Sequence, residues 1–235
     1  MAFWSNRRVL VTGCSGLIGG PLCKALLRHG ADITGYDLDY PGTLEAHGIA
    51  GEFRVNRADL VRDVGLDFAR QDVVFHLAAV SGVDAARKLG RIAFDVNVVG
   101  TLNLLAACRP DMGAVLLASS NHVYGRQPLD CLTAEDAPLN QLDTYSASKI
   151  MGDYLGRAYA HNYLIPTVVV RNTNCYGPID PHTDHLIPGA ILSLLEGRPP
   201  TLRGTGETRK SYLYVDDVVA AYMLLAEHVS ATRQI

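Results

Sequence analysis

The chain has 235 residues, 48% of them hydrophobic, so it can bury one substantial core and is expected to form one main domain. The net charge of −3 and the scattered Lys and Arg residues leave no basic stripe for a nucleic-acid backbone. The five cysteines are an odd number without CxxC spacing, which argues against a disulfide framework and a thiolate zinc site. No apolar run approaches the roughly 18 residues that span a bilayer, and the start lacks the order of a signal peptide. We therefore expect a cytoplasmic protein with neither a membrane nor a nucleic-acid partner.

Short apolar runs alternate along the chain with longer stretches of helical periodicity. This alternation is typical of an α/β fold in which helices cross over a doubly wound parallel sheet. The pattern predicts strands over residues 9–12, 32–36, 52–55, 72–77, 115–119 and 167–170, and helices over 17–28, 84–107 and 144–162.

A glycine-rich segment connects the first predicted strand to the first predicted helix. Gly13 can form the tight turn, Gly16 lets the backbone approach a pyrophosphate, and Gly19 permits close packing of helix on strand. Asp37 follows the second strand, where its carboxylate can accept hydrogen bonds from ribose hydroxyls and would repel a 2′-phosphate. These features predict a Rossmann-type domain that binds NAD rather than NADP. The contacts expected in this loop are Gly13, Gly16, Leu17, Ile18 and Gly19.

Two further segments carry the residues expected to act in catalysis. Tyr145 and Lys149 are four residues apart in a predicted helix, so they share one face of it. A nearby ammonium favours the phenolate, so we expect Lys149 to lower the pKa of Tyr145 and make it a usable acid or base. Ser120 follows the predicted strand 115–119, at the sheet edge where ligands of such folds bind. We expect its hydroxyl to contact the substrate.

After Arg171 the sequence pattern changes from alternating strands and helices to short segments interrupted by prolines, at 178, 181, 188, 199 and 200. The sequence therefore predicts an NAD-binding domain over residues 1–171 and a small, loop-rich substrate lobe over 172–235, interleaved with the main domain. The segment His182-Thr-Asp-His185 is interpreted as loop polarity rather than as a metal cluster, and no metal is expected.

Taken together, these residues resemble the extended short-chain dehydrogenase/reductase family, which contains the NAD-dependent nucleotide-sugar epimerases and dehydratases. The matching stretches cover nearly the whole chain: 12–19 (TGxxGxxG), 59–60 (DL), 76–79 (HLAA), 97–101 (NVVGT), 119–125 (SSxxVYG), 145–149 (YxxxK), 171–178 (RxxNxYGP) and 214–217 (YVDD).

The resemblance implies roles for further residues and for a partner. Asp59 and Leu60 would lie by the adenine, residues 77–79 (Leu77, Ala78 and Ala79) would line the cofactor, and Lys149 would also hold the nicotinamide ribose. Asn174 and Arg209 would bind the diphosphate of a nucleotide-diphosphate sugar. A homodimer would form through the helices at 84–107 and 144–162.

The chain departs from the family pattern in two ways. Family members are usually longer, so part of the usual substrate lobe is expected to be absent. Either the chain is a truncated or compact form, or its sugar site is built differently. Asn121 and His122 follow Ser120, where the 4,6-dehydratases carry Asp followed by Glu or Lys. Asn121 cannot supply a proton as a carboxylic acid does, and His122 is expected to be a hydrogen-bonding or structural residue rather than an acid or base. Both are expected to contact the substrate.

Four functions remain open on the sequence. The leading one is epimerisation of a nucleotide-linked sugar at C4 through a transient keto sugar, because the acid of the dehydratases is missing. A 4,6-dehydratase is the alternative, since residues 187–200 and 206–217 resemble the cytidine-diphosphoglucose branch. A sugar or uronate dehydrogenase is a third hypothesis, because SSNH resembles the motif of uronate dehydrogenases. A non-catalytic dinucleotide sensor is disfavoured by the retained Tyr145 and Lys149.

Overall fold

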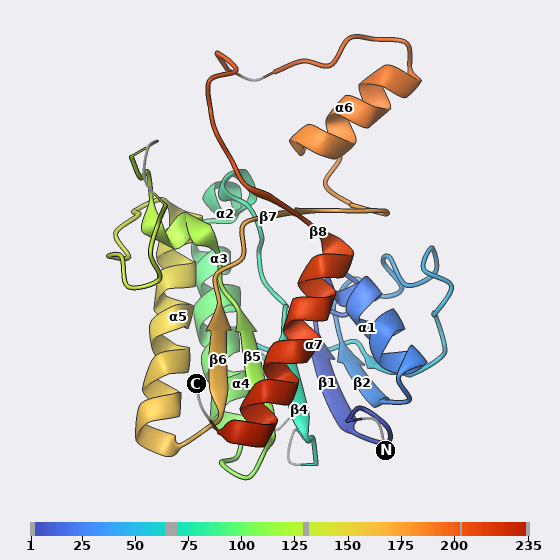
Figure 1. Ribbon diagram of the computed structural model, residues 1–235, viewed down its shortest axis with the longest axis vertical. Coiled ribbons are helices and arrows are strands. Elements are labelled where there is room, and N and C mark those ends of the chain that lie inside the picture. Colours follow the sequence, from blue (N-terminus) through green and yellow to red (C-terminus); the bar gives the residue numbers. More distant parts are fainter. Residues whose placement is uncertain (1–2, 64–69, 129–131, 203, 234–235) are drawn as a thin grey trace.

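The computed structural model describes residues 3–63, 70–128, 132–202 and 204–233, and its centre is a six-stranded parallel sheet. The strand order is β3-β2-β1-β4-β5-β6, which is the order of a doubly wound dinucleotide-binding sheet (Figure 1). The predicted fold class is confirmed. The strands are β1 (Arg8–Thr12), β2 (Asp32–Tyr36), β3 (Arg54–Asn56), β4 (Val73–His76), β5 (Ala114–Ala118) and β6 (Thr167–Val170).

The central strands are apolar on both faces because helices cover both sides of the sheet. Alternate side chains of β1, β4 and β5 enter two separate cores. One core contains Leu22 and Leu26 of α1 (Gly19–Arg28) together with Tyr222 of α7 (Val215–Thr232). The other contains residues of α4 (Thr101–Ala107), against which side chains of α5 (Thr144–Tyr163) pack.

The predicted helix over 84–107 is not continuous. It consists of α2 (Val83–Leu89), α3 (Arg91–Phe94), a π-helical turn (Asp95–Gly100) and α4. Gly90 interrupts the first part with φ 54° and ψ −116°, a conformation that suits glycine and does not continue a helix. Among the helices that the structure describes, none alone has the length and apolarity needed to cross a membrane. The helix α2 and residues 91–107 have that length and apolarity only when taken together, and the two are bent by 115°.

The segment after Arg171 contains elements that the sequence pattern did not indicate. β7 (Asn174–Tyr176) and β8 (Tyr212–Tyr214) form a separate two-stranded parallel sheet, and α6 (Leu186–Leu195) stands apart from the main body (Figure 1). α7 then returns and packs on the main sheet, where Trp4 Nε1 donates a 2.5 Å hydrogen bond to Glu227. The division at residue 171 stays a prediction, and part of the second segment contributes to the core of the first.

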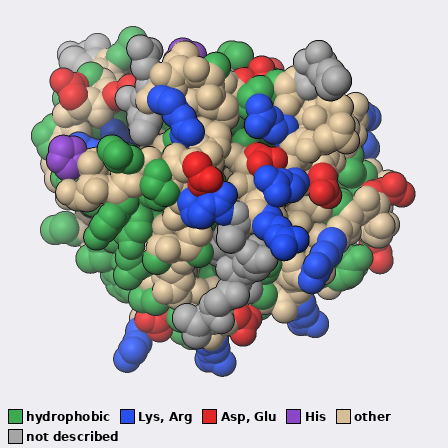
Figure 2. Space-filling view, turned by 90° about the horizontal axis from the view of Figure 1, so that it is seen from below, with side chains coloured by type: hydrophobic (Ala, Val, Ile, Leu, Met, Phe, Trp, Pro, Cys, Tyr) green, Lys and Arg blue, Asp and Glu red, His purple; other side chains and the backbone are tan. Residues whose placement is uncertain are grey.

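Charges of both signs alternate over the face opposite α6. Figure 2 shows that face, on which Lys and Arg side chains are interspersed with Asp and Glu. Four cysteines are described, and all four are free thiols: Cys14, Cys23, Cys108 and Cys175. Cys131 lies outside the described residues.

Candidate functional site

The glycine loop between β1 and α1 has the close packing that a dinucleotide cradle requires. Gly13 has φ +70°, and a Cβ there would lie 2.7 Å from Ala78 N and 2.8 Å from Leu77 C. A Cβ on Gly19 would overlap the carbonyl oxygen of Gly13. The loop therefore needs glycine at both positions, and its bare backbone with the first N–H groups of α1 fits the pyrophosphate of a dinucleotide.

Asp37 lies beside this loop at the carboxyl end of β2. Its Oδ2 accepts a 2.8 Å hydrogen bond from the backbone N–H of Ser15, and its Oδ1 accepts one of 3.1 Å from Asp39 N. The carboxylate is thus fixed next to the cradle by backbone donors. A carboxylate in this position fits a ribose diol and disfavours a phosphate on it.

A buried histidine fixes the strand ends that support the cradle. His76 Nδ1 lies 2.8 Å from Thr12 Oγ1, which also accepts a hydrogen bond from Ala78 N. His76 Nε2 lies 2.9 Å from Thr101 Oγ1 on α4. Burial lowers the pKa of His76 to about 3, so the ring is neutral and takes one hydrogen bond as acceptor and one as donor.

The remaining residues expected at the cofactor lie along this edge. Ile18 is the N-cap of α1 and packs against the first core, whereas Leu60 is buried in the second. Asp59 Oδ1 accepts a hydrogen bond from Val61 N within its own turn. Leu77 N donates to Thr12 O, which holds this segment against the glycine loop. The contacts of these residues with a cofactor stay predictions.

The three residues expected in catalysis come from two neighbouring elements. Ser120 follows β5, and Tyr145 and Lys149 lie in the first two turns of α5. Asp143 caps this helix, because its carboxylate accepts hydrogen bonds from Ser146 N at 3.0 Å and Ser146 Oγ at 2.7 Å. The Ser120 side chain is hydrogen-bonded to Tyr145, so the predicted pair is brought together.

The expectation of a lowered pKa for Tyr145 is wrong for this structure. Burial raises the pKa of the phenol, and the hydrogen bond from Ser120 offsets this only in part. Lys149 Nζ donates a 2.9 Å hydrogen bond to the carbonyl of Ala118. Burial lowers the pKa of Lys149 to about 8, so desolvation opposes its positive charge, although the ammonium is still the main form at pH 7.

The predicted substrate residues divide into two groups. The ring of His122 meets Tyr145 edge to face with centroids 5.9 Å apart, and its side chain is hydrogen-bonded to Asn174. Burial and the charge of Lys210 lower the pKa of His122, so it is neutral at pH 7. Asn121 Nδ2 instead donates to Thr173 Oγ1 at 3.3 Å. Arg209 is exposed between α6 and β8 and has no ion pair with the part of the chain that is described.

Asn97 in the π-helical turn is a positioning residue that the sequence interpretation left without a role. Its side chain accepts a hydrogen bond from Val80 N at 2.8 Å and donates to Val80 O at 3.0 Å. It also donates to Ser148 Oγ, which in turn donates to the carbonyl of Tyr145. The loop after β4 is thereby tied to the helix that carries the catalytic pair. The signal in the sequence that could have indicated this role is a polar amide within an otherwise apolar helical stretch.

Arg171 and Asp153 form a second structural unit behind the site. Arg171 makes two hydrogen bonds to the Asp153 carboxylate, at 2.7 and 3.0 Å, and a third at 2.7 Å to the hydroxyl of Tyr124. The side chain of Asp153 is fully buried. The pair links α5 to the end of β6 and to the turn that follows Ser120.

Comparison with known proteins agrees with this geometry. The family model described as "NAD dependent epimerase/dehydratase family" matches residues 9–235. The chain is 34% identical over 244 residues to the dTDP-glucose 4,6-dehydratase of Neisseria meningitidis, covering 95% of this chain and 68% of that protein. It is 36% identical to the UDP-glucose 4-epimerase of Mycolicibacterium smegmatis, covering 92% and 72% of the two chains.

Solved structures show the same likeness. The UDP-glucuronic acid 4-epimerase of Bacillus cereus, in complex with UDP-glucuronic acid and NAD, superposes with a TM-score of 0.82 at 29% identity, covering 92% of this chain and 72% of that one. These matches confirm the predicted resemblance, the NAD cofactor class and the enzyme class. The chain belongs to the NAD-dependent epimerase/dehydratase family of extended short-chain dehydrogenases/reductases.

Proposed function

We propose that the protein is an NAD-dependent nucleotide-sugar epimerase that inverts C4. The chain spans about two thirds of the length of the curated relatives it matches, 68% and 66% for the first two. The observation that carries the proposal is the hydrogen-bonded pair Ser120 and Tyr145, followed by an amide at Asn121 whose Nδ2 is engaged by Thr173. This pair suits oxidation and reduction at a sugar hydroxyl, whereas elimination of water needs an acid that Asn121 does not provide.

The residues of this site divide the work of moving and holding the proton. Tyr145 receives the proton of the C4 hydroxyl and returns it after the sugar has turned over. Ser120 hydrogen-bonds the reacting oxygen and orients it towards Tyr145. Bound in its oxidised form, NAD supplies the hydride acceptor and a positive ring charge that favours the phenolate. Gly13, Gly16, Gly19 and Asp37 would hold it.

The substrate class follows from the site and from the relatives. UDP-sugars and dTDP-glucose stand in the names of similar proteins, which supports a nucleotide-diphosphate sugar for this chain. The diphosphate is proposed to bind to Asn174, which lies next to His122, and to the exposed Arg209. A guanidinium suits this role because it can form bidentate hydrogen bonds with phosphate oxygens.

A 4,6-dehydratase is the second candidate, and one observation favours it. The neutral ring of His122 contacts Tyr145 and is hydrogen-bonded to Asn174, so a titratable group lies where the dehydratases use acid and base side chains. The identity to a dTDP-glucose 4,6-dehydratase points the same way.

Incubation with NAD and a panel of nucleotide sugars, followed by NMR of the products, tests the proposal. UDP-glucose, UDP-glucuronic acid and dTDP-glucose form the panel. A C4-inverted product supports epimerisation. A 4-keto-6-deoxy product would show that the protein is a dehydratase instead. Net NADH formation on a free uronic acid would instead identify a dehydrogenase.

Tyr145→Phe is the matched variant for this assay. It should lower turnover by about 10²–10⁴-fold, the usual contribution of a positioned acid or base. NAD binding and thermal stability should stay unchanged. Tyr163→Phe, at the exposed end of the same helix, is the control and should keep full activity. Equal activity of both variants would contradict the role of Tyr145.

We further propose a cytoplasmic homodimer that forms through α5 and the segment 91–107. The two carry exposed apolar side chains, among them Ile92, Leu102, Met151 and Tyr154. Figure 2 shows hydrophobic side chains gathered on the side of the molecule where α5 lies. Light scattering after size exclusion should give twice the chain mass, and Met151→Glu should shift it to the monomer.

A further inference from the structure

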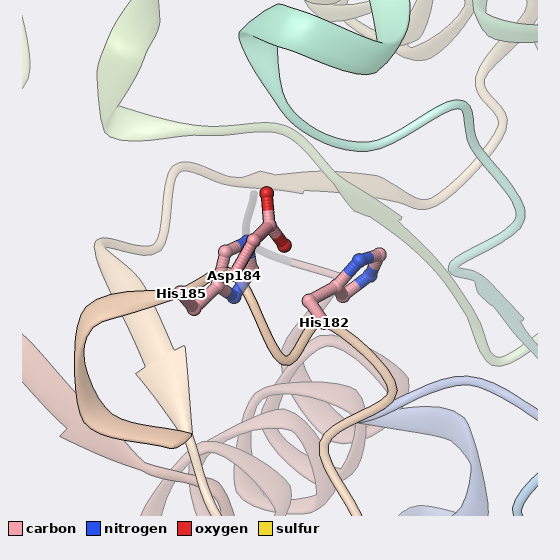
Figure 3. Close-up of side chains that lie close together, drawn as sticks. All are labelled: His182, Asp184 and His185. Carbon is pink, nitrogen blue, oxygen red and sulfur yellow. The ribbon is translucent and has the colours of Figure 1, made fainter. Parts of the chain in front are cut away.

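The loop before α6 gathers four side chains that a metal ion would suit. His182, Asp184 and His185 place one ligand atom each within 4.8 Å of one another (Figure 3). The rings of the two histidines stack with centroids 4.8 Å apart. Backbone hydrogen bonds fix the loop, since His185 N donates to His182 O and Gly189 N donates to His185 O.

Asp180 supplies an independent observation that points to a ligand. Its side chain is 2% exposed, and Oδ1 accepts a 2.9 Å hydrogen bond from His182 N. Oδ2 is buried, makes no hydrogen bond to the residues described, and lies 3.5 Å from His185 Nδ1. A buried carboxylate oxygen is costly unless it has a cationic or hydrogen-bonding partner. An imidazole held by a metal through its other nitrogen presents such a donor, in the arrangement known from carboxylate–histidine–zinc units.

We propose that this loop is a binding site for a divalent transition metal of the zinc type. His182, Asp184 and His185 are the ligands, and Asp180 orients His185. Two imidazoles and a carboxylate are the donors that zinc prefers, and three protein ligands leave a fourth position open. The two carboxylates balance the charge of the ion at the N-terminus of α6, where the helix dipole alone would disfavour a cation.

Modest side-chain rotation suffices to close this site. Zinc ligands at about 2.1 Å from the metal are roughly 3.4 Å apart in a tetrahedron, which is less than the 4.8 Å found here. Asp184 and His185 are exposed, so the main contacts that this movement must keep or rearrange are the stacking of His185 on His182 and its approach to Asp180. His182 Nε2 also lies 3.4 Å from Ser81 Oγ, so the site adjoins the loop that follows β4. The proposal does not depend on which sugar reaction the protein performs.

Titration of tag-free, chelator-treated protein with ZnCl₂ in a calorimeter tests the site. We expect one equivalent to bind with a Kd in the micromolar range or below. His185→Ala and Asp184→Ala should each weaken binding at least tenfold, and both side chains are exposed, so folding should survive. Asp180→Asn should weaken it by about 10–100-fold, as expected of a group that orients a ligand. His161→Ala, at an exposed position in α5, is the matched control.

Cobalt provides a readout of the ligand set itself. Co²⁺ in the site should give the intense visible absorption of a tetrahedral centre, and His182→Ala should abolish it. The proposal is overturned if zinc does not bind below about 100 μM. It is equally overturned if the double variant His182→Ala/His185→Ala binds like the parent, or if His161→Ala loses as much affinity.

Discussion

Replacing Gly13 by alanine should destabilise the protein and weaken NAD binding together. The backbone at Gly13 is left-handed, with φ +70°, which costs an alanine about 1–2 kcal/mol. The added Cβ would meet the backbone atoms Ala78 N at 2.7 Å and Leu77 C at 2.8 Å. Forcing a core segment to shift costs a further ~1–3 kcal/mol. The free energy of unfolding should therefore fall by about 2–5 kcal/mol, and Tm by on the order of 10 °C.

Gly48→Ala is the control that separates strain from collision. Gly48 has nearly the same φ, +68°, but nothing lies within 4 Å of the position that an added Cβ would take. This variant should lose only about 1–2 kcal/mol and should bind NAD normally. Urea denaturation gives the two stabilities, and fluorescence titration gives the two NAD affinities. Equal destabilisation of the two variants, or unchanged NAD affinity in Gly13→Ala, would refute the argument from backbone contact.

Three other variants test the supports of the site, each by urea denaturation. Asp153→Asn leaves the Arg171 guanidinium without its buried partner and should lower the free energy of unfolding by about 3–5 kcal/mol. Asp84→Asn, in an exposed ion pair, is its control and should lower it by under about 1 kcal/mol. Similar losses in the two variants would contradict the role of burial. Asn97→Leu leaves the Val80 N–H and carbonyl without partners and should cost about 2–4 kcal/mol; a neutral effect would show that water replaces the amide. The pKa of His76 is about 3 in the folded protein and near 6.5 in the unfolded chain. Between these two pH values only the unfolded chain binds the proton. The free energy of unfolding therefore falls as the pH drops below 6.5, by about 1.4 kcal/mol per pH unit. His76→Gln should remove that part of the pH dependence, and an unchanged slope between pH 5 and 8 would count against it.

Much of the main sheet could be predicted because its strands are buried on both faces and are flanked by glycines and polar residues. β1 and β2 begin or end within a residue of the predicted limits, and α5 does so as well. β7 and β8 have three residues each and lie in a segment interrupted by prolines and glycines, which indicated loops rather than strands. The break at Gly90 was missed because apolar periodicity continues on both sides of it.

The site was predictable in its residues but not in its electrostatics. Ser120 and Tyr145 are paired as the strand end and helix spacing indicate. The shift in the pKa of Tyr145 was predicted in the wrong direction. The spacing along the helix shows that Lys149 is a neighbour, but it does not show how deeply the phenol is buried. It also does not show that the lysine donates a hydrogen bond to the carbonyl of Ala118. The loop at 182–185 was interpreted as polar surface for a similar reason: the sequence does not show that its side chains converge, or that Asp180 is buried beside them.

The hydrogen bond between Trp4 and Glu227 has a consequence for how the protein acquires its structure. The two residues are 223 positions apart, and Trp4 is the single tryptophan of the chain. During synthesis, the sheet face that α7 covers stays open to water until residues 215–232 have emerged, and exposed apolar surface of this kind is where aggregation begins. Because Trp4 is 2% exposed once α7 has docked, its fluorescence provides a built-in optical signal for this closure in refolding experiments.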